Sequence, residues 1–183
     1  MIKLYTERLL IRDPILNDLL DYHELISNDK AMIFWQDNKT NNIEETKEKL
    51  LLAIEQSKSV DRKNYFLKIF DKNTNNYIGE IGYKVIENTS FGKIVSLSYG
   101  IKEKYWNNGY TTEAVKRIIK FGFEENDVYR FMAGCLKENI GSEKVMINCN
   151  LIKEAEFKEL VPYNGILKDS VEYRLLKHEW NDL

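Results

Sequence analysis

The residues best suited to chemistry lie in the polar stretch 102–114, which reads KEKYWNNGYTTEA. Its Asn-Asn-Gly at 107–109 stands directly before an amphipathic segment that predicts a helix. A glycine at a helix N-terminus lets backbone N–H groups approach an anion, and the helix dipole strengthens the attraction. The stretch therefore predicts a site for a phosphate or pyrophosphate group. The same residues also fit a plain turn with Thr111 or Thr112 as the helix cap, and spacing alone does not decide between the two.

Two common nucleotide-binding motifs do not fit this stretch. A P-loop requires a lysine after its second glycine, and that lysine is missing here. A Rossmann fingerprint requires three glycines near the first strand, whereas this stretch holds a single glycine late in the chain. The sequence therefore points to a different phosphate-bearing ligand.

The composition narrows the class of protein. The chain has 183 residues, with 27 Lys and Arg against 29 Asp and Glu, and its net charge of −2 argues against a nucleic-acid binder with a broad basic surface. With 43% hydrophobic residues it can bury one sizeable core, so we expect a single domain over residues 1–183. The first segment lacks the apolar run of a signal peptide, and no later run is long enough for a membrane helix. We therefore expect a cytoplasmic protein with no membrane partner.

The cysteines and histidines give no sign of a metal site. Cys135 and Cys149 do not form a C-x-x-C pair, and so few cysteines in a chain of this length indicate reduced core thiols. His23 and His178 have no neighbouring cluster of cysteines or histidines. We therefore expect no metal.

The segments around the polar stretch predict an α+β fold with a mixed sheet. Apolar alternation predicts strands, helical spacing of apolar residues predicts helices, and the first three strands after the opening helices suit an antiparallel meander. A right-handed crossover is expected to join the parallel strands at 93–101 and 128–136. The expected order is a strand at 4–12, helices at 15–26 and 43–54, strands at 65–70, 77–85 and 93–101, a helix from 109 to about 125, a strand at 128–136, a helix at 139–149 and a terminal strand pair at 151–160 and 167–176.

Five short motifs are spread over nearly the whole chain. They are TERLLIR at 6–12, YIGEIG at 77–82, YGI at 99–101 followed by YWNNGYTTEA at 105–114, NIGS at 139–142 and LLKHEW at 175–180. Together they resemble the GNAT superfamily of acyl-CoA-dependent N-acetyltransferases, in particular the branch of ribosomal-protein N-terminal alanine acetyltransferases.

The most specific of these motifs resembles the pyrophosphate loop of that superfamily, [R/Q]-x-x-G-x-[G/A]. Gly109 stands at the glycine and Thr111 at the final small position, whereas Trp106 replaces the usual Arg or Gln. Most contacts of this loop are made by the backbone, so the resemblance implies that it tolerates Trp106.

The resemblance implies the GNAT fold, in which two parallel strands splay apart around acetyl-CoA. In this chain the two strands would be 93–101 and 128–136. The backbone around Ile101 would bind the pantetheine, the loop amides would hold the pyrophosphate, and Asn139 with Ser142 would flank the thioester. The implied cofactor-binding residues are Ile101, Trp106, Asn107, Asn108, Gly109, Tyr110, Thr111, Asn139 and Ser142.

Acetyl transfer needs an acid for the leaving thiolate. In many GNAT enzymes a tyrosine seven residues after the asparagine is that acid, but Met146 occupies the position here and cannot donate a proton. We therefore predict that Ser142, one helical turn beyond Asn139, is the donor. A serine that only caps the helix would fit the same position.

The reaction also needs a base for the amine proton. We predict Glu80 on the third strand, and the alternative is a solvated glutamate on an edge face. Glu154 and Glu156 are weaker candidates, because they alternate along a strand in a way that suits outward-facing charges. Asn150 stands where the family usually has glycine, and asparagine tolerates the left-handed conformation that ends a helix there.

The leading hypothesis is an enzyme that transfers an acetyl group from acetyl-CoA to a primary amine by direct attack in a ternary complex. The acceptor could be a protein N-terminus or a small molecule such as an aminoglycoside or polyamine. One alternative, motivated by Met146 and Trp106, is a catalytically weak or inactive acyl-CoA-binding or regulatory protein on the same scaffold. A structural protein without a cofactor is the third hypothesis. Edge strands at the carboxyl end could pair across a homodimer.

Overall fold

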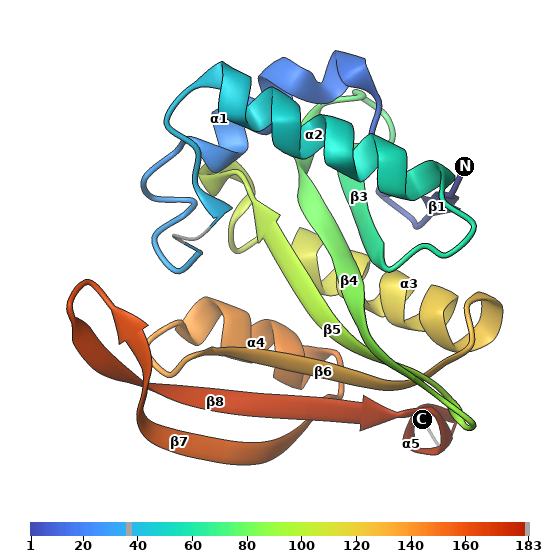
Figure 1. The fold of residues 1–183 in the computed structure, drawn as a ribbon, viewed down its shortest axis with the longest axis vertical. Helices are drawn as coiled ribbons and strands as arrows, with labels where there is room; N and C mark the ends of the chain where they lie inside the picture. The colour runs from blue at the N-terminus through green and yellow to red at the C-terminus, as the bar shows by residue number, and fades with distance from the viewer. Residues whose placement is uncertain (36–37, 182–183) are drawn as a thin grey trace. The chain divides into compact units, whose positions relative to one another are not determined.

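The computed structural model describes residues 1–35 and 38–181 (Figure 1). The chain divides into two compact units: unit 1 comprises residues 1–84 and 98–118, and unit 2 comprises residues 85–97 and 119–183. The single domain expected over the whole chain stays a prediction. The elements are β1 (Lys3–Tyr5), β2 (Leu9–Arg12), η1 (Leu16–Asp18), α1 (Leu19–Ile26), α2 (Ile43–Lys58), β3 (Asn64–Asp71), β4 (Tyr77–Thr89), β5 (Gly92–Ile101), η3 (Glu103–Tyr105), α3 (Tyr110–Glu125), β6 (Val128–Leu136), α4 (Ile140–Asn148), β7 (Ile152–Tyr163), β8 (Ile166–Leu176) and α5 (Lys177–Asn181).

The single strand expected at 4–12 is wrong, because the chain turns back on itself at Thr6. The Thr6 N–H donates to the Leu9 carbonyl at 3.0 Å, and the Thr6 hydroxyl accepts from the Leu9 N–H at 2.8 Å. The two halves become the antiparallel strands β1 and β2, with Leu4 opposite Ile11. This turn exposes Arg8 at its end, which matters for the site described below.

In unit 1, β1, β2, β3 and β4 are neighbours in that order, and all three pairs are antiparallel. The predicted helix at 15–26 begins with the short η1 before α1, and the helix predicted at 43–54 continues to Lys58 as α2. Asn42 caps α2 by accepting from the Glu45 N–H at 2.9 Å. Figure 1 shows α1 and α2 side by side, and a core cluster joins them to the strands: Tyr22, Leu25, Ile26, Met32, Leu50, Phe70 and Tyr77.

In unit 2, the neighbouring strands follow the order β5, β6, β8 and β7. β5 and β6 are parallel, with Lys93–Ser96 paired to Val128–Met132, so the predicted parallel pairing is confirmed and the right-handed crossover stays a prediction. β6 pairs with β8, and β8 with β7, in antiparallel register. β7 ends this strand order, and the homodimer that its outer edge could form stays a prediction.

Two further features of unit 2 follow from its sequence. Phe123 of α3 packs against Phe131 of β6 with ring centroids 5.1 Å apart, and Gly122 makes room for that ring. Asn150 adopts a φ of 61°, so the left-handed helix end predicted there is confirmed. Within residues 1–35 and 38–181, no helix is long and apolar enough to cross a membrane.

Candidate cofactor and active site

The loop between β5 and α3 comprises residues 102–109 and leads into the N-terminus of the helix. Asn107 and Gly109 both have positive φ, at 59° and 75°. The Glu113 N–H donates to the Gly109 carbonyl at 3.0 Å, which is the first bond of the helical ladder. The N–H groups of the helical turn before it have no acceptor within the helix, and such groups bind anions.

Trp106 stabilises this loop from within. Its indole Nε1–H donates to the Ile101 carbonyl at 3.1 Å, and the Asn108 side chain donates to the Trp106 carbonyl at 2.8 Å. A carbonyl oxygen has two lone pairs, so this bond leaves Ile101 able to accept another one. The residue that replaces the usual Arg or Gln therefore has a structural task in the loop.

A clamp formed by Thr6, Arg8 and Glu113 ties the first turn of α3 to the turn between β1 and β2. One Glu113 oxygen accepts from the Thr6 hydroxyl at 2.5 Å and from the Arg8 N–H at 2.9 Å. The other accepts from Arg8 Nε at 2.6 Å. Burial acts to raise the pKa of Glu113, but the hydrogen bonds from Thr6 and Arg8 outweigh it and the pKa is lowered. Glu113 therefore stays ionised and keeps the clamp closed.

The Arg8 guanidinium also contacts the loop before α3. Its Nη1 donates to the Asn108 carbonyl at 3.0 Å, and its Cζ lies 4.4 Å from the centroid of the Tyr110 ring. An added Cβ on Gly109 would meet Arg8 Nη2 at 3.5 Å, and apart from the two chain neighbours of Gly109 no other atom of the described residues lies within 4 Å of it. The space above Gly109 is therefore open and flanked by a cation, which fits a pyrophosphate.

Lys102 fastens the start of the loop to α1. Its Nζ donates to Asp21 and to Glu24, both at 2.9 Å, and its N–H donates to the Ile78 carbonyl at 2.9 Å. Burial acts to lower the pKa of Lys102, but the two carboxylates outweigh it and the pKa is raised. The loop is thus held at its start by Lys102 and at its end by the clamp.

The predicted base Glu80 lies in the interior of unit 1, with 6% of its surface exposed. Its carboxylate is paired with Lys68, a fully buried lysine whose Nζ lies 3.3 Å from the ring centroid of Tyr22. Burial lowers the pKa of Lys68, and the charge of Glu80 opposes that shift. The solvated glutamate considered as the alternative is wrong. The ion pair gives Glu80 a structural role, and its role as a base stays a prediction.

In unit 2, Asn139 and Ser142 meet at the start of α4. Asn139 Oδ1 accepts from the Ser142 N–H at 3.1 Å, so Asn139 is the helix cap. The Ser142 hydroxyl is hydrogen-bonded to the thiol of Cys135 on β6. Burial raises the pKa of that thiol to about 11 in spite of this bond. Met146 is buried, as expected of a residue that has no part in proton transfer.

Tyr173 carries a hydroxyl group that was not predicted from the sequence as part of the site. It lies on β8 opposite Ala133, and its OH donates to Glu143 Oε1 of α4 at 2.8 Å. Burial, followed by this bond to Glu143, raises the pKa of Tyr173 to about 12, so the phenol stays protonated. Its distance along the chain from Asn139 hid it, because only the pairing of β6 with β8 brings it to α4.

The weaker base candidates are both neutralised by basic side chains. Glu154 is paired with Arg130 and lies 3.8 Å from Arg174. Glu156 is hydrogen-bonded to Lys137, Lys153 and Lys158, and these bonds lower its pKa to about 2. Carboxylates held in this way are poor proton acceptors near neutral pH.

Within unit 1, the predicted cofactor residues from Ile101 to Thr111 lie together in the loop and the first turn of α3. Within unit 2, Asn139 lies beside Ser142. A profile of the acetyltransferase (GNAT) domain family matches residues 8–151, which is more than half of the chain. The chain belongs to the GNAT acetyltransferase family. GNAT enzymes take their acetyl group from acetyl-CoA, so the predicted enzyme class and cosubstrate are confirmed.

Known proteins resemble the chain over almost its whole length. The uncharacterized N-acetyltransferase YnaD of Bacillus subtilis is 27% identical over 96% of this chain and 98% of its own. The crystal structure of ribosomal-protein-S5-alanine acetyltransferase from Vibrio fischeri superposes with a TM-score of 0.85 at 22% identity, covering 98% of this chain and 99% of that one. Spermidine N-acetyltransferase from Vibrio cholerae, solved with CoA and spermine, gives 0.81 at 18% identity, covering 96% and 99%. The predicted GNAT fold is confirmed.

The clamp gives a first prediction. Replacing Arg8 by Met removes the partner of Glu113 and Asn108, so we expect acetyl-CoA to bind about tenfold more weakly, or ~1.4 kcal/mol. Lys30→Met is the control, because its pair with Glu103 involves the same loop but is mostly exposed. Calorimetric titration with acetyl-CoA measures both. Equal affinity of Arg8→Met and the wild type would contradict a role for the clamp.

The Lys68–Glu80 pair gives a second prediction. Glu80→Gln leaves a buried lysine without its counter-charge, so we expect the free energy of unfolding to fall by about 3–5 kcal/mol. Glu103→Gln breaks an exposed pair and should change it by less than about 1 kcal/mol. Urea unfolding measures the difference. A Glu80→Gln protein of normal stability that lost only kcat would favour the base role instead.

Proposed function

We propose that this GNAT enzyme acetylates a primary amine, which attacks acetyl-CoA directly within a ternary complex. The observation that carries the proposal is the start of α3, where Gly109 has a positive φ and the Arg8 guanidinium lies beside it while donating to the Asn108 carbonyl. Such an arrangement supports binding of a pyrophosphate through N–H groups and one cation. The protein must then bind the amine, accept its proton and protonate the leaving sulfur.

Ser142 is the proposed proton donor for the leaving sulfur. Its hydroxyl already forms a hydrogen bond with a sulfur atom, that of Cys135. It lies in the first turn of α4, where the helix dipole stabilises negative charge that develops on an oxygen or sulfur. Tyr173 is a second protonated hydroxyl in contact with α4, through Glu143. These hydroxyls support catalysis although Met146 replaces the usual tyrosine.

The alternative of an inactive acyl-CoA-binding protein rests on Trp106 and Met146. Both substitutions have explanations that leave activity possible. Trp106 holds the loop by its bond to the Ile101 carbonyl, so its presence does not remove the anion site. Met146 is a core residue, and Ser142 offers another proton donor. An active enzyme is therefore the better account.

The acceptor we propose is a primary amine at a protein N-terminus or on a small molecule. Proteins of the same fold include an enzyme named for ribosomal protein S5 and alanine, and one named for spermidine. The charge of −2 favours neither class. An acceptor panel should therefore hold a peptide that begins with alanine and spermidine, with thiol release as the readout.

The test of the anion site uses Thr111→Asp with Thr111→Asn as its matched control. The negative charge of an aspartate in the first helical turn interacts favourably with the helix dipole, so the fold should persist. The same charge repels a phosphate bound at this position. We expect acetyl-CoA affinity to fall at least about tenfold in Thr111→Asp and by less than about threefold in Thr111→Asn. Calorimetry measures the affinities.

Wild-type protein that binds acetyl-CoA and releases thiol with one of the amines would support the whole proposal. Binding without turnover on any amine would favour the inactive binding protein. Equal affinities in the aspartate and asparagine variants would place the phosphates elsewhere and remove the observation on which the proposal rests.

A further inference from the structure

Glu172 of β8 differs from the other carboxylates of unit 2. It is half-buried, and among the described residues it has no hydrogen bond or ion pair. Its counterparts in the described part of unit 2 are either paired with cations or exposed. The paired ones include Glu138, Glu143, Glu154, Glu156, Asp169 and Glu179, and the exposed unpaired ones include Glu87 and Glu159.

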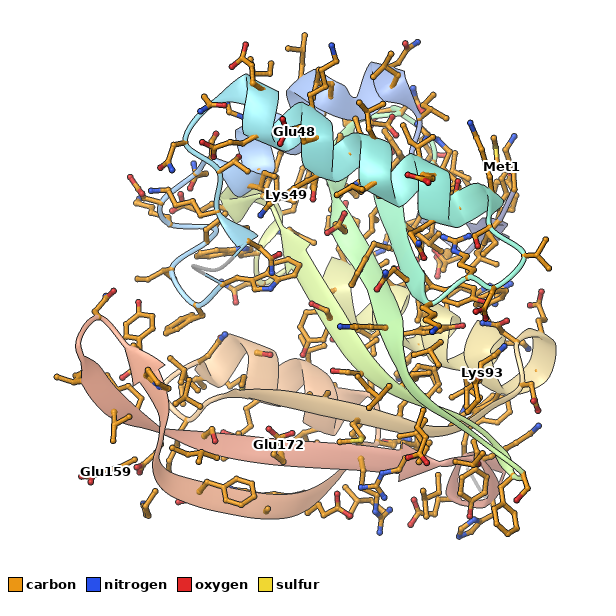
Figure 2. All side chains as sticks on the ribbon, in the orientation of Figure 1. Met1, Glu48, Lys49, Lys93, Glu159 and Glu172 are labelled. Carbon is orange, nitrogen blue, oxygen red and sulfur yellow. The ribbon has the colours of Figure 1, made fainter. Side chains whose placement is uncertain are left out.

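A glycine on the neighbouring strand makes room for this carboxylate. Gly134 of β6 lies opposite Glu172 in the antiparallel register. A Cβ added to Gly134 would lie 2.4 Å from Glu172 Oε1 and 2.6 Å from Oε2. The carboxylate therefore rests on the backbone of β6, in the space that any other residue at position 134 would fill (Figure 2).

The part of β6 under this carboxylate has an open edge within unit 2. The pairing of β5 with β6 ends at Ser96 and Met132, whereas β6 continues to Leu136. The backbone groups on that edge beyond Met132 are therefore not paired with β5 inside the unit. On the same stretch of β6, Cys135 contacts Ser142, the proposed donor to the leaving sulfur.

The charges around Glu172 leave it able to accept a proton. Glu154 of β7 is the acidic neighbour, and Arg130 of β6 and Arg174 of β8 lie beside Glu154. The Cys135 thiol has a raised pKa and is neutral. Burial, followed by the charge of Glu154, raises the pKa of Glu172 above the usual value of a glutamate. A carboxylate of raised pKa is a stronger base when it is ionised.

We propose that Glu172 is the general base that takes the proton from the acceptor amine. This inference rests on the proposed function. The amine nitrogen forms a bond to the acetyl carbon, the carbon–sulfur bond breaks and its electron pair goes to the sulfur. The proton lost by the nitrogen goes to the Glu172 carboxylate, and the Ser142 hydroxyl gives its proton to the sulfur, so that the products are an amide and free CoA. Water then returns a proton to Ser142 and takes one from Glu172.

Glu172 has an advantage over the base predicted from the sequence. Protonation of Glu80 would leave the fully buried Lys68 without its counter-charge, whereas protonation of Glu172 breaks no contact in the described part of the chain. Glu154 and Glu156 would each have to give up cationic partners. The proton can therefore reach Glu172 at the least cost in existing interactions.

The test compares Glu172→Gln with Glu159→Gln, using whichever amine of the panel wild-type protein acetylates. Both changes remove one unpaired carboxylate, but Glu159 is exposed on the outer strand β7 (Figure 2). We expect kcat to fall by at least about 100-fold in Glu172→Gln and to stay normal in Glu159→Gln, with acetyl-CoA affinity unchanged in both. Glu172→Asp should retain part of the activity.

The pH profile separates a base from a merely structural residue. In the wild type, kcat should fall as the pH drops through the raised pKa of Glu172, because protonated glutamate cannot accept a proton. The same fall should persist in Glu172→Asp and vanish in Glu172→Gln. Glu172→Asp also serves as the test if the glutamine variant does not fold.

Normal kcat and an unchanged pH profile in Glu172→Gln, with an active wild type, would overturn the inference and leave the proposed function intact. A raised KM with unchanged kcat would also overturn it, because Glu172 would then bind the acceptor without taking its proton. Acetyl-CoA binding by a wild type that acetylates no amine would overturn both proposals together.

Discussion

The Glu113 carboxylate joins two turns that lie 105 residues apart in the chain. The N-terminus of α3 is the proposed anion site, and its direction depends on what fixes the first helical turn. Glu113 fixes that turn, because its oxygens accept hydrogen bonds from Thr6 and Arg8. Arg8 then reaches Asn108 and shapes the loop before the helix. The proposed cofactor site of this GNAT enzyme therefore depends on the turn between β1 and β2 as much as on the loop.

Three carboxylates of the chain differ in the hydrogen bonds and ion pairs that they form. Glu80 is needed where it is, because a buried Lys68 would otherwise lack a counter-charge. Glu113 holds the clamp together. Burial acts to raise its pKa, but the hydrogen bonds from Thr6 and Arg8 lower it, so the carboxylate stays ionised. Glu172 has no hydrogen bond or ion pair among the described residues. A carboxylate without such interactions can gain and lose a proton during a reaction without breaking a contact that stabilises the fold.

Sequence reasoning found the elements whose patterns are local. The strand expected at 128–136 has the observed bounds, and Asn150 has the left-handed conformation expected of it. It missed the break at Thr6, because a turn within an alternating segment depends on one side-chain hydrogen bond. It also missed the roles of Arg8 and Glu172. Arg8 acts across 105 residues, and Glu172 depends on the register that sets it over Gly134.

We infer that the α3 N-terminus and Arg8 bind the phosphates of acetyl-CoA. The most direct measurement compares the dissociation constants of acetyl-CoA and S-acetylpantetheine, which has the same thioester arm but no phosphate. We expect acetyl-CoA to bind at least about 100-fold more tightly, or ~2.7 kcal/mol, because charge-assisted bonds to the pyrophosphate are lost in the shorter compound. Equal affinities would contradict it, since binding would then depend on the thioester arm alone.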